Sequence, residues 1–326
     1  MKRKILLMAS LLAALTSCTS NDKNVEEDKS SNGNLKIGIV QYMDHASLDQ
    51  AREGFIDYLK DNKIKADFEI ENENGDSSLA NQVPEKFKDY DLVYAIGTPA
   101  AQGAKNVLKD EPIIFSAVTD PVGSGLVKDE KNPDENITGI SDYVDSSKQV
   151  DDFLKTFPEV KKFGVIYNTG EQNSQVQVEN LEKSLDERGL SLKKIGITST
   201  NDIDQALQSI KKDIDCLFLL TDNMVASSAP LVAKVMGEAK IYQLSADEGQ
   251  VYKGLLLSQG ISYYEEGQIA GEMAKEILVD KKEIKDIAVK YHDDTKLIIN
   301  KDMANTLDID LNDEAFKDAK IVETQK

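Results

Sequence analysis

The sequence predicts an α/β protein with two doubly wound parallel-sheet lobes. The chain has 326 residues, of which 40% are hydrophobic, and this is enough for two ordinary domains with a core each. From residue 35 onward, short apolar or β-branched runs alternate with segments of helical period, which is typical of parallel strands connected by helices. The alternation comes as two successive series, so we expect two sheets of the same kind.

The first series of apolar runs predicts the strands of one sheet. Amphipathic stretches separate the runs and are expected to form helices; one of them carries Leu48, Ala51, Phe55 and Leu59 at helical spacing. The predicted strands of this sheet cover residues 35–40, 64–70, 92–96, 112–116 and 137–140.

The second series predicts the other sheet, again with helices between the strands. Its predicted strands cover residues 163–167, 192–197, 216–220 and 241–244. Further strands and helices follow that neither sheet needs to be complete. We therefore expect the chain to cross between the lobes again. These elements are a run over 255–261, a helix over 264–278, and a strand and helix around 297–307.

The first residues have the form of an export signal. A basic start at residues 2–4 precedes an apolar run over 5–15, which is too short for a lasting membrane-spanning helix. The run ends in Leu15-Thr16-Ser17-Cys18, which resembles the lipobox of bacterial lipoproteins. We therefore expect residues 1–17 to be a signal peptide and Cys18 to be lipidated, with residues 18–33 as a solvated tether.

Composition argues against several classes of protein. A formal net charge of −19 argues against wrapping a nucleic-acid backbone. The chain has 2 histidines and 2 cysteines, too few for a Cys/His metal site or a disulfide framework. No G-x-G-x-x-G or P-loop pattern follows a predicted strand, so we expect no cofactor. Only His45 and His292 could act as a histidine base, which leaves nucleophilic catalysis poorly supported.

Polar residues follow the predicted strands at the carboxyl edge, where open α/β sheets bind ligands. Thr98 fits a helix N-cap and Pro99 the first helical position, so free amides there would attract a carboxylate. Asn173 or Ser174 fits the cap of a helix in the second half. Because such groups occur in both halves, we expect one shared interlobe ligand site. Its candidates include Gln41, Asp120, Ser174 and Thr221.

Several of these runs, in their order and spacing, carry a family resemblance: Ile39-Val40-Gln41, His45, Leu48-Asp49, Gly97-Thr98-Pro99-Ala100-Ala101-Gln102, Thr119-Asp120-Pro121, Thr138-Gly139-Ile140-Ser141-Asp142, Tyr167-Asn168-Thr169-Gly170-Glu171, Asn173-Ser174 and Thr221-Asp222-Asn223. They resemble the substrate-binding lipoproteins of ABC importers for tryptophan and tyrosine. The resemblance implies a type I periplasmic-binding-protein fold with three crossovers that closes over one small ligand. The two lobes would then comprise residues 34–145 with 262–285, and residues 146–261 with 286–322.

The resemblance also implies an aromatic amino acid as the ligand, whose groups can be matched to candidate residues. The candidates for the ligand's carboxylate are Thr98, the Ala100 backbone, Ser116 and Thr119. For its ammonium group the first candidate is Asp222, followed by Glu171 and Asp247. Tyr42, Tyr167 and Tyr143 are candidates for contact with the ring, and Asn168, Asn173 and Asn223 for a polar ring edge. Nothing among them distinguishes phenylalanine from tyrosine or tryptophan.

The resemblance further implies an extracytoplasmic, membrane-anchored monomer that delivers its ligand to an ABC permease with its ATPase. The expected mechanism is capture rather than catalysis. Three alternatives stay open at this point. The same fold could bind a sugar, a purine or a branched-chain amino acid; the protein could be a ligand sensor; or it could be an enzyme whose turnover depends on His45 or Asp222.

Overall fold

A computed structural model describes residues 34–133, 136–292 and 295–325. The expected signal peptide, Cys18 and the tether lie outside the described residues. From Asn34 onward the chain forms one compact unit that contains two sheets, each with its own hydrophobic core. No helix in the described ranges combines the length and the apolar character needed to cross a bilayer.

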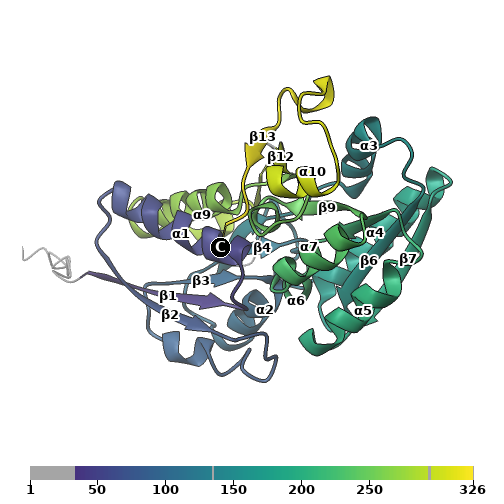
Figure 1. The fold of residues 1–326 in the computed structure, drawn as a ribbon. Coiled ribbons are helices and arrows are strands. Elements are labelled where there is room, and N and C mark those ends of the chain that lie inside the picture. Colours follow the sequence, from purple (N-terminus) through teal and green to yellow (C-terminus); the bar gives the residue numbers. More distant parts are fainter. Residues whose placement is uncertain (1–33, 134–135, 293–294, 326) are drawn as a thin grey trace, which may run out of the picture. The chain divides into compact units, whose positions relative to one another are not determined.

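A 6-stranded sheet in the order β11-β5-β4-β3-β1-β2 forms the first lobe (Figure 1). All of its pairs are parallel, and its central strands are fully buried, which explains their continuous apolar sequence. The strands are β1 (Leu35–Gln41), β2 (Ala66–Asn72), β3 (Leu92–Ile96), β4 (Ile113–Val118), β5 (Ile137–Ser141) and β11 (Lys290–Tyr291). The helices are α1 (Ala46–Asp61), α2 (Thr98–Val107) and α9 (Tyr263–Leu278).

A 7-stranded sheet in the order β13-β12-β10-β9-β8-β6-β7 forms the second lobe. Its pairs are parallel except for β10 with β12. The strands are β6 (Lys162–Asn168), β7 (Ser191–Ile197), β8 (Cys216–Leu219), β9 (Tyr242–Asp247), β10 (Leu257–Ile261), β12 (Lys296–Asn300) and β13 (Lys320–Val322). The helices are α3 (Ser146–Thr156), α4 (Gln172–Glu187), α5 (Ile203–Ile210), α6 (Asn223–Ala226), α7 (Ala229–Glu238), α8 (Gly249–Tyr252) and α10 (Lys301–Thr306).

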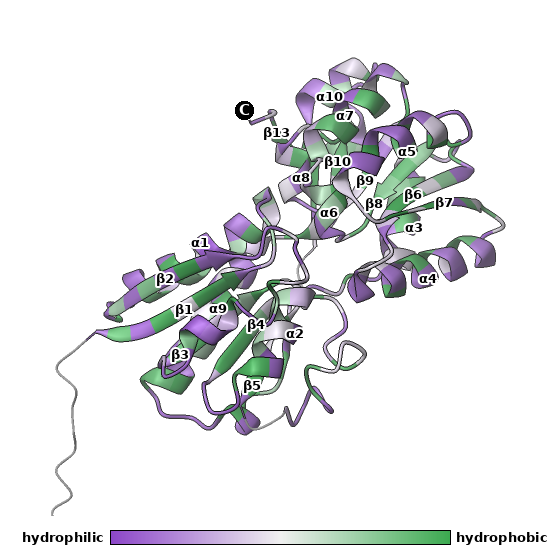
Figure 2. Ribbon diagram, turned by 90° about the horizontal axis from the view of Figure 1, so that it is seen from below, coloured by the Kyte–Doolittle hydropathy of each residue, from purple (hydrophilic) through white to green (hydrophobic). Residues whose placement is uncertain are grey.

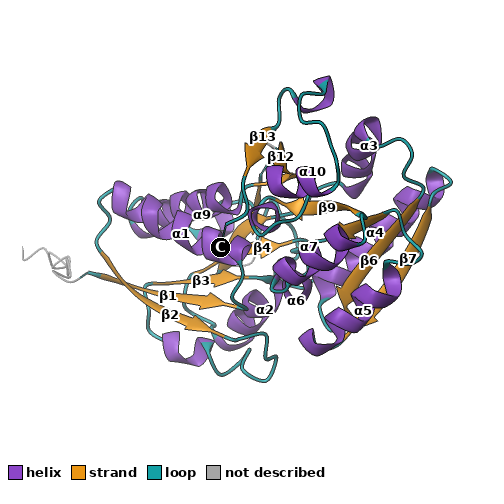
Figure 3. Cartoon of the chain, viewed as in Figure 1, coloured by secondary structure: helices purple, strands orange, loops and turns teal. Residues whose placement is uncertain are grey.

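Short 3₁₀ helices complete the connections at Pro84–Phe87, Thr200–Asp202, Ile284–Asp286 and Glu314–Phe316. Figure 3 shows helices on both faces of each sheet, which is the doubly wound arrangement that the sequence predicts. In Figure 2 the inner strands are largely hydrophobic, and the helices carry hydrophilic residues along their length. Cys216 lies fully buried in β8.

The chain passes between the two sheets after β5 and after β10, and β11 and β12 belong to different sheets. Helix α9 packs in the first core although β10, directly before it, belongs to the second sheet. Lys290 and Tyr291 pair with Ile140 and Ser141 of β5. The family resemblance implies that the first lobe ends at residue 285. We propose instead that it extends to Tyr291.

Helices α1 and α9 lie side by side on the first sheet (Figure 1). Glycines allow their backbones to touch. A Cβ atom at Gly54 would come within 2.0 Å of the Tyr264 carbonyl oxygen, and one at Gly267 within 2.0 Å of the Ala51 carbonyl oxygen. Any larger side chain at either position would push the helices apart, so α1 and α9 are closely packed along their backbones.

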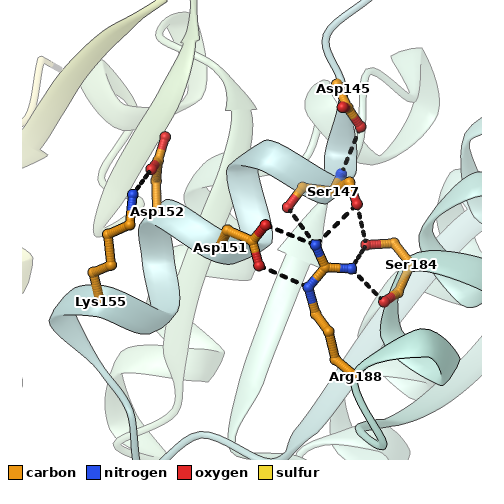
Figure 4. Close-up of polar contacts among 7 residues, drawn as sticks. All are labelled: Asp145, Ser147, Asp151, Asp152, Lys155, Ser184 and Arg188. Carbon is orange, nitrogen blue, oxygen red and sulfur yellow. Dashed lines mark hydrogen bonds and ion pairs between the residues drawn. The ribbon is translucent and has the colours of Figure 1, made fainter.

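In the second lobe, Arg188 joins α3 to the end of α4 (Figure 4). Its guanidinium group donates to both carboxylate oxygens of Asp151 at 2.7 Å, to the Ser184 carbonyl at 2.6 Å and to the Ser147 hydroxyl at 3.0 Å. This forked contact fixes the first helix of the second lobe against the helix that carries Glu171 and Ser174 near its start.

Candidate functional site

A narrow cavity lies between the carboxyl edges of the two sheets. Carboxylates and hydroxyls dominate its polar lining, and no lysine or arginine among the described residues lines it. The first lobe contributes His45, Leu48, Ala117, Asp142 and Tyr263, and the second lobe contributes Thr221, Asp222, Asn223, Ala226 and Asp247. Such a surface favours a ligand that carries a positive charge.

A hydrogen-bonded network of the second lobe holds Asp222 and Glu171 in place. The Asp222 carboxylate accepts from the Asn168 amide at 2.6 Å and, as the N-cap of α6, from the Val225 amide at 2.9 Å. Glu171 accepts from the side-chain amides of Asn168 at 3.0 Å and Asn223 at 2.5 Å. Both oxygens of each carboxylate are therefore satisfied by protein donors.

Burial sets the charge state of this network. Burial, together with the neighbouring Asp222, raises the pKa of Glu171 to about 7, although hydrogen bonds from three asparagines oppose the shift. Burial also raises the pKa of Asp222, and the amides of Asn168 and Val225 and the hydroxyl of Ser174 oppose this rise. Burial therefore holds both carboxyl groups closer to protonation than exposed ones, and the hydrogen bonds from the network favour their charged forms.

The start of α2 borders the cavity from the first lobe. Gly97, with φ of 100°, occupies the N-cap position and Thr98 is the first helical residue, so the predicted cap at Thr98 is wrong by one position. The reason is that the chain turns at a positive φ, which glycine adopts readily. A Cβ at Gly97 would lie 3.9 Å from Oδ1 of Asn223, which lines the cavity. The Thr98 hydroxyl is buried and has no hydrogen-bond partner.

Tyr42 follows β1 and lies between acidic groups of both lobes. Burial, and then the charges of Glu171, Glu73 and Asp222, raises the pKa of its phenol far above the usual value. Its hydroxyl donates to the Gly75 carbonyl at 3.4 Å. Tyr42 therefore lies near the second-lobe network, although it is not among the residues that line the cavity.

Three pairs of side chains join the lobes directly. The Ser47 hydroxyl donates to Asp247 at 2.8 Å, the hydroxyls of Thr119 and Thr221 lie 3.2 Å apart, and Nε2 of His45 lies 3.2 Å from Oδ1 of Asn223. Burial lowers the pKa of His45, which favours the neutral imidazole. His45 stands directly before α1, and its role is an interlobe contact at the start of that helix.

Several predicted site residues have other surroundings. The Ser116 hydroxyl lies 2.6 Å from the Tyr94 hydroxyl inside the first core, because its position on β4 faces that core rather than the cavity. Gln41 is buried and bonds to Met43, Asp49 and Arg52 within its own lobe. Ala100 is buried in the first turn of α2.

Three further candidate residues lie outside the cavity lining. Asp120 accepts from the Gly123 amide at 2.7 Å in its own turn. Tyr167 lines a different surface pocket, with Thr169 and Lys194, because alternate residues of β6 face opposite sides of the sheet. Tyr143 is 42% exposed and does not line the cavity.

The predicted helix caps of the second half also differ. Glu171, and neither Asn173 nor Ser174, stands at the N-cap of α4. Asn173 instead donates to the Thr221 carbonyl at 2.9 Å, and Ser174 bonds to Asp222. Both side chains thereby support the network around Asp222.

The residue-by-residue prediction missed Asp142 and Tyr263. Asp142 directly follows β5, so the rule that found the other strand ends could have found it. Its Oδ2 accepts from the Tyr263 hydroxyl at 2.6 Å, and its Oδ1 is buried with no hydrogen-bond partner. Burial and the charge of Asp247 raise the pKa of Asp142 to about 6, against the lowering effect of hydroxyls from Tyr263 and Thr119. Tyr263 comes from the far end of the sequence, and only the crossover brings it here.

Comparison with known proteins identifies relatives of the whole described unit. A tyrosine-binding protein of Clostridioides difficile (strain R20291) is 40% identical over 318 residues, which are 93% of this chain and 91% of the relative. The structure of an ABC domain from Streptococcus pneumoniae in complex with L-Trp is 32% identical and superposes with a TM-score of 0.83, covering 89% of this chain and 100% of the other.

A ligand-free, open structure of a substrate-binding protein with adhesive properties from Clostridium difficile is 39% identical. It superposes with a TM-score of 0.68 and covers 89% of this chain and 100% of the other. The family model for ABC transporter substrate binding proteins matches residues 36–323. The fold is that of the type I periplasmic binding proteins, and the chain belongs to the family of ABC transporter substrate-binding proteins.

Proposed function

We propose that this protein captures an aromatic amino acid, namely tyrosine, tryptophan or phenylalanine, between its lobes and delivers it to an ABC permease and its ATPase. Two relatives support the class of ligand: one is named for tyrosine and the other is a complex with L-Trp. The observation that carries the proposal is the cavity itself. Its lining carboxylates, Asp142, Asp222 and Asp247, match the ammonium group of a free amino acid, and the nearby start of α2 has free amides for the ligand's carboxylate.

The ligand's carboxylate would be bound at the start of α2. Free amides at a helix N-terminus and the helix dipole favour an anion. The buried hydroxyl of Thr98 has no protein partner and stands at this end of α2, a helix of 10 residues. The Ala100 amide and the Thr119 hydroxyl stay candidates for the same group. Ser116 is not a candidate for the ligand's carboxylate, because its hydroxyl is hydrogen-bonded to the Tyr94 hydroxyl.

The ligand's ammonium group would be bound by the acidic side of the cavity. Asp142, Asp222 and Asp247 line it, with Glu171 directly behind Asn223. A buried ammonium without a carboxylate would be costly, so this charge arrangement favours an amine over a neutral sugar. The Tyr42 ring would pack against the aromatic side chain, and the amides of Asn168, Asn173 and Asn223 could reach a polar ring edge.

We further propose that closure of the lobes accompanies capture. The hydrogen bonds from Ser47 to Asp247 and between Thr119 and Thr221 would form only when the lobes meet. The fit to the tryptophan complex is better than that to the ligand-free open structure, although the latter has the higher identity. This supports a ligand that shifts the population towards the joined state.

The location and anchoring are also part of the proposal. The sequence Leu15-Thr16-Ser17-Cys18 supports a lipid anchor on Cys18 after removal of a signal peptide, on the extracytoplasmic side of the cell membrane. The tether would keep the binding unit close to its permease and raise its effective concentration there. A monomer suits this role because both lobes must be free to move. The role requires no catalysis.

Thermal unfolding of residues 19–326 tests the proposal, after refolding to remove any carried ligand. Each of the common amino acids, sugars and nucleosides is added in excess. A ligand at 100 times its Kd stabilises the folded state by about 2.7 kcal/mol, which shifts the Tm by several degrees. We expect only aromatic amino acids to give this shift. A shift with a sugar or a nucleoside alone would overturn the ligand class.

A further inference from the structure

Asp142 occupies a special position at the junction of the lobes. It follows β5, at the point where the chain leaves the first sheet, and the Tyr263 hydroxyl that bonds to it begins α9, where the chain has returned. Both side chains line the cavity and both are almost completely buried. Two separate crossovers of the chain therefore meet at one carboxylate.

The oxygens of Asp142 differ in their surroundings. Oδ2 accepts the 2.6 Å hydrogen bond from Tyr263, and this fixes the orientation of the carboxylate. Oδ1 is buried without a hydrogen-bond partner, although the Thr119 hydroxyl lies close enough to the carboxylate to lower its pKa. A buried carboxylate oxygen without a donor is costly and rare in a native protein, so it calls for a partner that binds there.

The other carboxylates that line the cavity are already satisfied. Asp222 accepts from the amides of Asn168 and Val225, one at each oxygen. Asp247 accepts from the Ser47 hydroxyl at one oxygen and from the Gln250 side chain, at 2.7 Å, at the other. Among the lining carboxylates, Asp142 alone combines exposure to the cavity with an unpaired oxygen in the part of the chain that is described.

The partner that fits this oxygen is a cationic donor. The cavity has several acidic groups and no lysine or arginine in its described lining, so these groups would repel an anionic partner at Oδ1. No group of three His, Cys, Asp or Glu side chains in the described ranges is placed to hold a metal ion. An organic ammonium group supplies both the charge and the N–H donors that the site lacks.

We propose that Asp142 receives the α-ammonium group of the ligand and that Tyr263 acts as the positioning residue that orients it. The inference rests on the proposed function, because it assigns one group of the same amino-acid ligand. It moves this role from Asp222, the candidate favoured by the sequence, to a residue of the first lobe. Asp222 then organises the face that closes over the ligand.

Isothermal titration calorimetry on the full-length chain in detergent tests this inference with two ligands. One is L-tyrosine and the other is 3-(4-hydroxyphenyl)propionic acid, which lacks only the amino group. The variant is Asp142→Asn, which keeps the shape of the side chain and removes its charge. Asp110→Asn is the matched control, because Asp110 is exposed in the loop between α2 and β4.

We expect Asp142→Asn to weaken L-tyrosine binding about 30-fold, the range typical of losing a hydrogen bond to a charged group. The amine-free analogue should bind weakly and equally to both proteins, and Asp110→Asn should match the wild type with each ligand. Equal losses with both ligands, or no loss with L-tyrosine, would overturn the assignment.

Tyr263→Phe provides a second test that does not alter the carboxylate. Loss of the orienting hydroxyl should weaken L-tyrosine about fivefold and leave the analogue unaffected, since a single neutral hydrogen bond is at stake. An unchanged affinity for L-tyrosine would contradict the positioning role. If the wild type binds a sugar or a nucleoside and no aromatic amino acid, the proposed function fails together with this inference. Loss of the amine-selective effect alone removes only the inference.

Discussion

The buried carboxylates of the two lobes differ in how their oxygens are satisfied. Three buried carboxylates of the second lobe accept protein hydrogen bonds at both oxygens: Glu171, Asp222 and Asp247. Those of the first lobe each leave at least one buried oxygen without a donor: Glu73, Asp142 and Glu266. Glu73 has no partner at either oxygen, and Glu266 accepts at only one, from the Ala117 amide at 2.7 Å.

This difference indicates different tasks for the two faces. A satisfied network is rigid, because every member is held by several others, so the second lobe presents a preformed surface. An unsatisfied acceptor stores an unfavourable energy that a ligand donor can relieve. Of the three first-lobe carboxylates only Asp142 lines the cavity, so under the proposed function it is the one whose free oxygen a ligand donor would satisfy.

The largest expected effect comes from breaking the second-lobe network. Asp222→Ala removes the acceptor of two buried amides, those of Asn168 and Val225, and the N-cap of α6. We expect the free energy of unfolding to fall by about 3 kcal/mol, as measured by urea titration without ligand. Asp186→Ala, at an exposed position of α4, is the control and should change little. A loss below about 1 kcal/mol for Asp222→Ala would mean that this face is not held by its network.

The next effect comes from relieving an unsatisfied group of the first lobe. Burial raises the pKa of Glu73 to about 7 from an ordinary value of 4.5. The folded state thus binds this proton more tightly than the unfolded state, so stability that is present below pH 4.5 is lost as the pH rises through 7.

Glu73→Gln should therefore stabilise the protein by about 2 kcal/mol at alkaline pH and by almost nothing in acid. Thermal unfolding across the pH range measures this difference. Glu53→Gln, on the exposed face of α1, should show no such pH dependence. The same gain at every pH would contradict the argument, because it would not come from the charge.

A smaller effect sharpens the distinction between ligand affinity and stability. Thr98→Val removes a buried hydroxyl that has no protein partner, so the ligand-free Tm should stay within about a degree of the wild type or rise. Affinity for an aromatic amino acid should fall about tenfold, because the ligand carboxylate loses a donor. Scanning calorimetry measures the Tm and titration calorimetry measures the affinity. Thr98→Ser keeps the hydroxyl and should retain the wild-type affinity. A lower Tm with unchanged affinity would reverse the assignment.

The smallest effect concerns the support of the second lobe. Arg188→Lys loses the forked contact with Asp151 and the bonds to Ser147 and Ser184 (Figure 4). We expect a loss of about 1 kcal/mol in the free energy of unfolding, because the pair is partly exposed, and no change in affinity. Lys155→Met breaks a single contact with Asp152 in which the lysine side chain is 75% exposed, and it should have no measurable effect. Equal effects of the two variants would show that the fork has no special role.

Much of the fold could be predicted because its strands are buried on both faces. The strand at 92–96 is predicted with its observed bounds, as a run of five buried residues. The strands β11 and β13, of 2 and 3 residues, were not predicted, since segments so short have no period to detect. The surplus elements after residue 261 did indicate a return to the first lobe, and α9 makes that return.

The sequence predicts that the site lies at the carboxyl edges of the sheets, but it does not predict which side chains point into the cavity. Asp222, Asn223 and Thr221 line the cavity, because the carboxyl ends of parallel strands meet there. Ser116 and Tyr167 do not, because a strand points alternate residues to opposite faces and the sequence does not show which face is inward. The partnership of Asp142 with Tyr263 depends on a separation of 121 residues along the chain.

The backbone contact between α1 and α9 makes the lobe rotation measurable from outside. Gly54 and Gly267 bring these helices into backbone contact, so a dye on the exposed face of α1 would report on the lobe to which Tyr263, at the start of α9, belongs. A donor dye at Glu53→Cys and an acceptor at Glu187→Cys, both exposed positions, would report on the angle between the lobes by energy transfer. Cys216 would not compete for the dye, because it is buried and burial raises the pKa of its thiol.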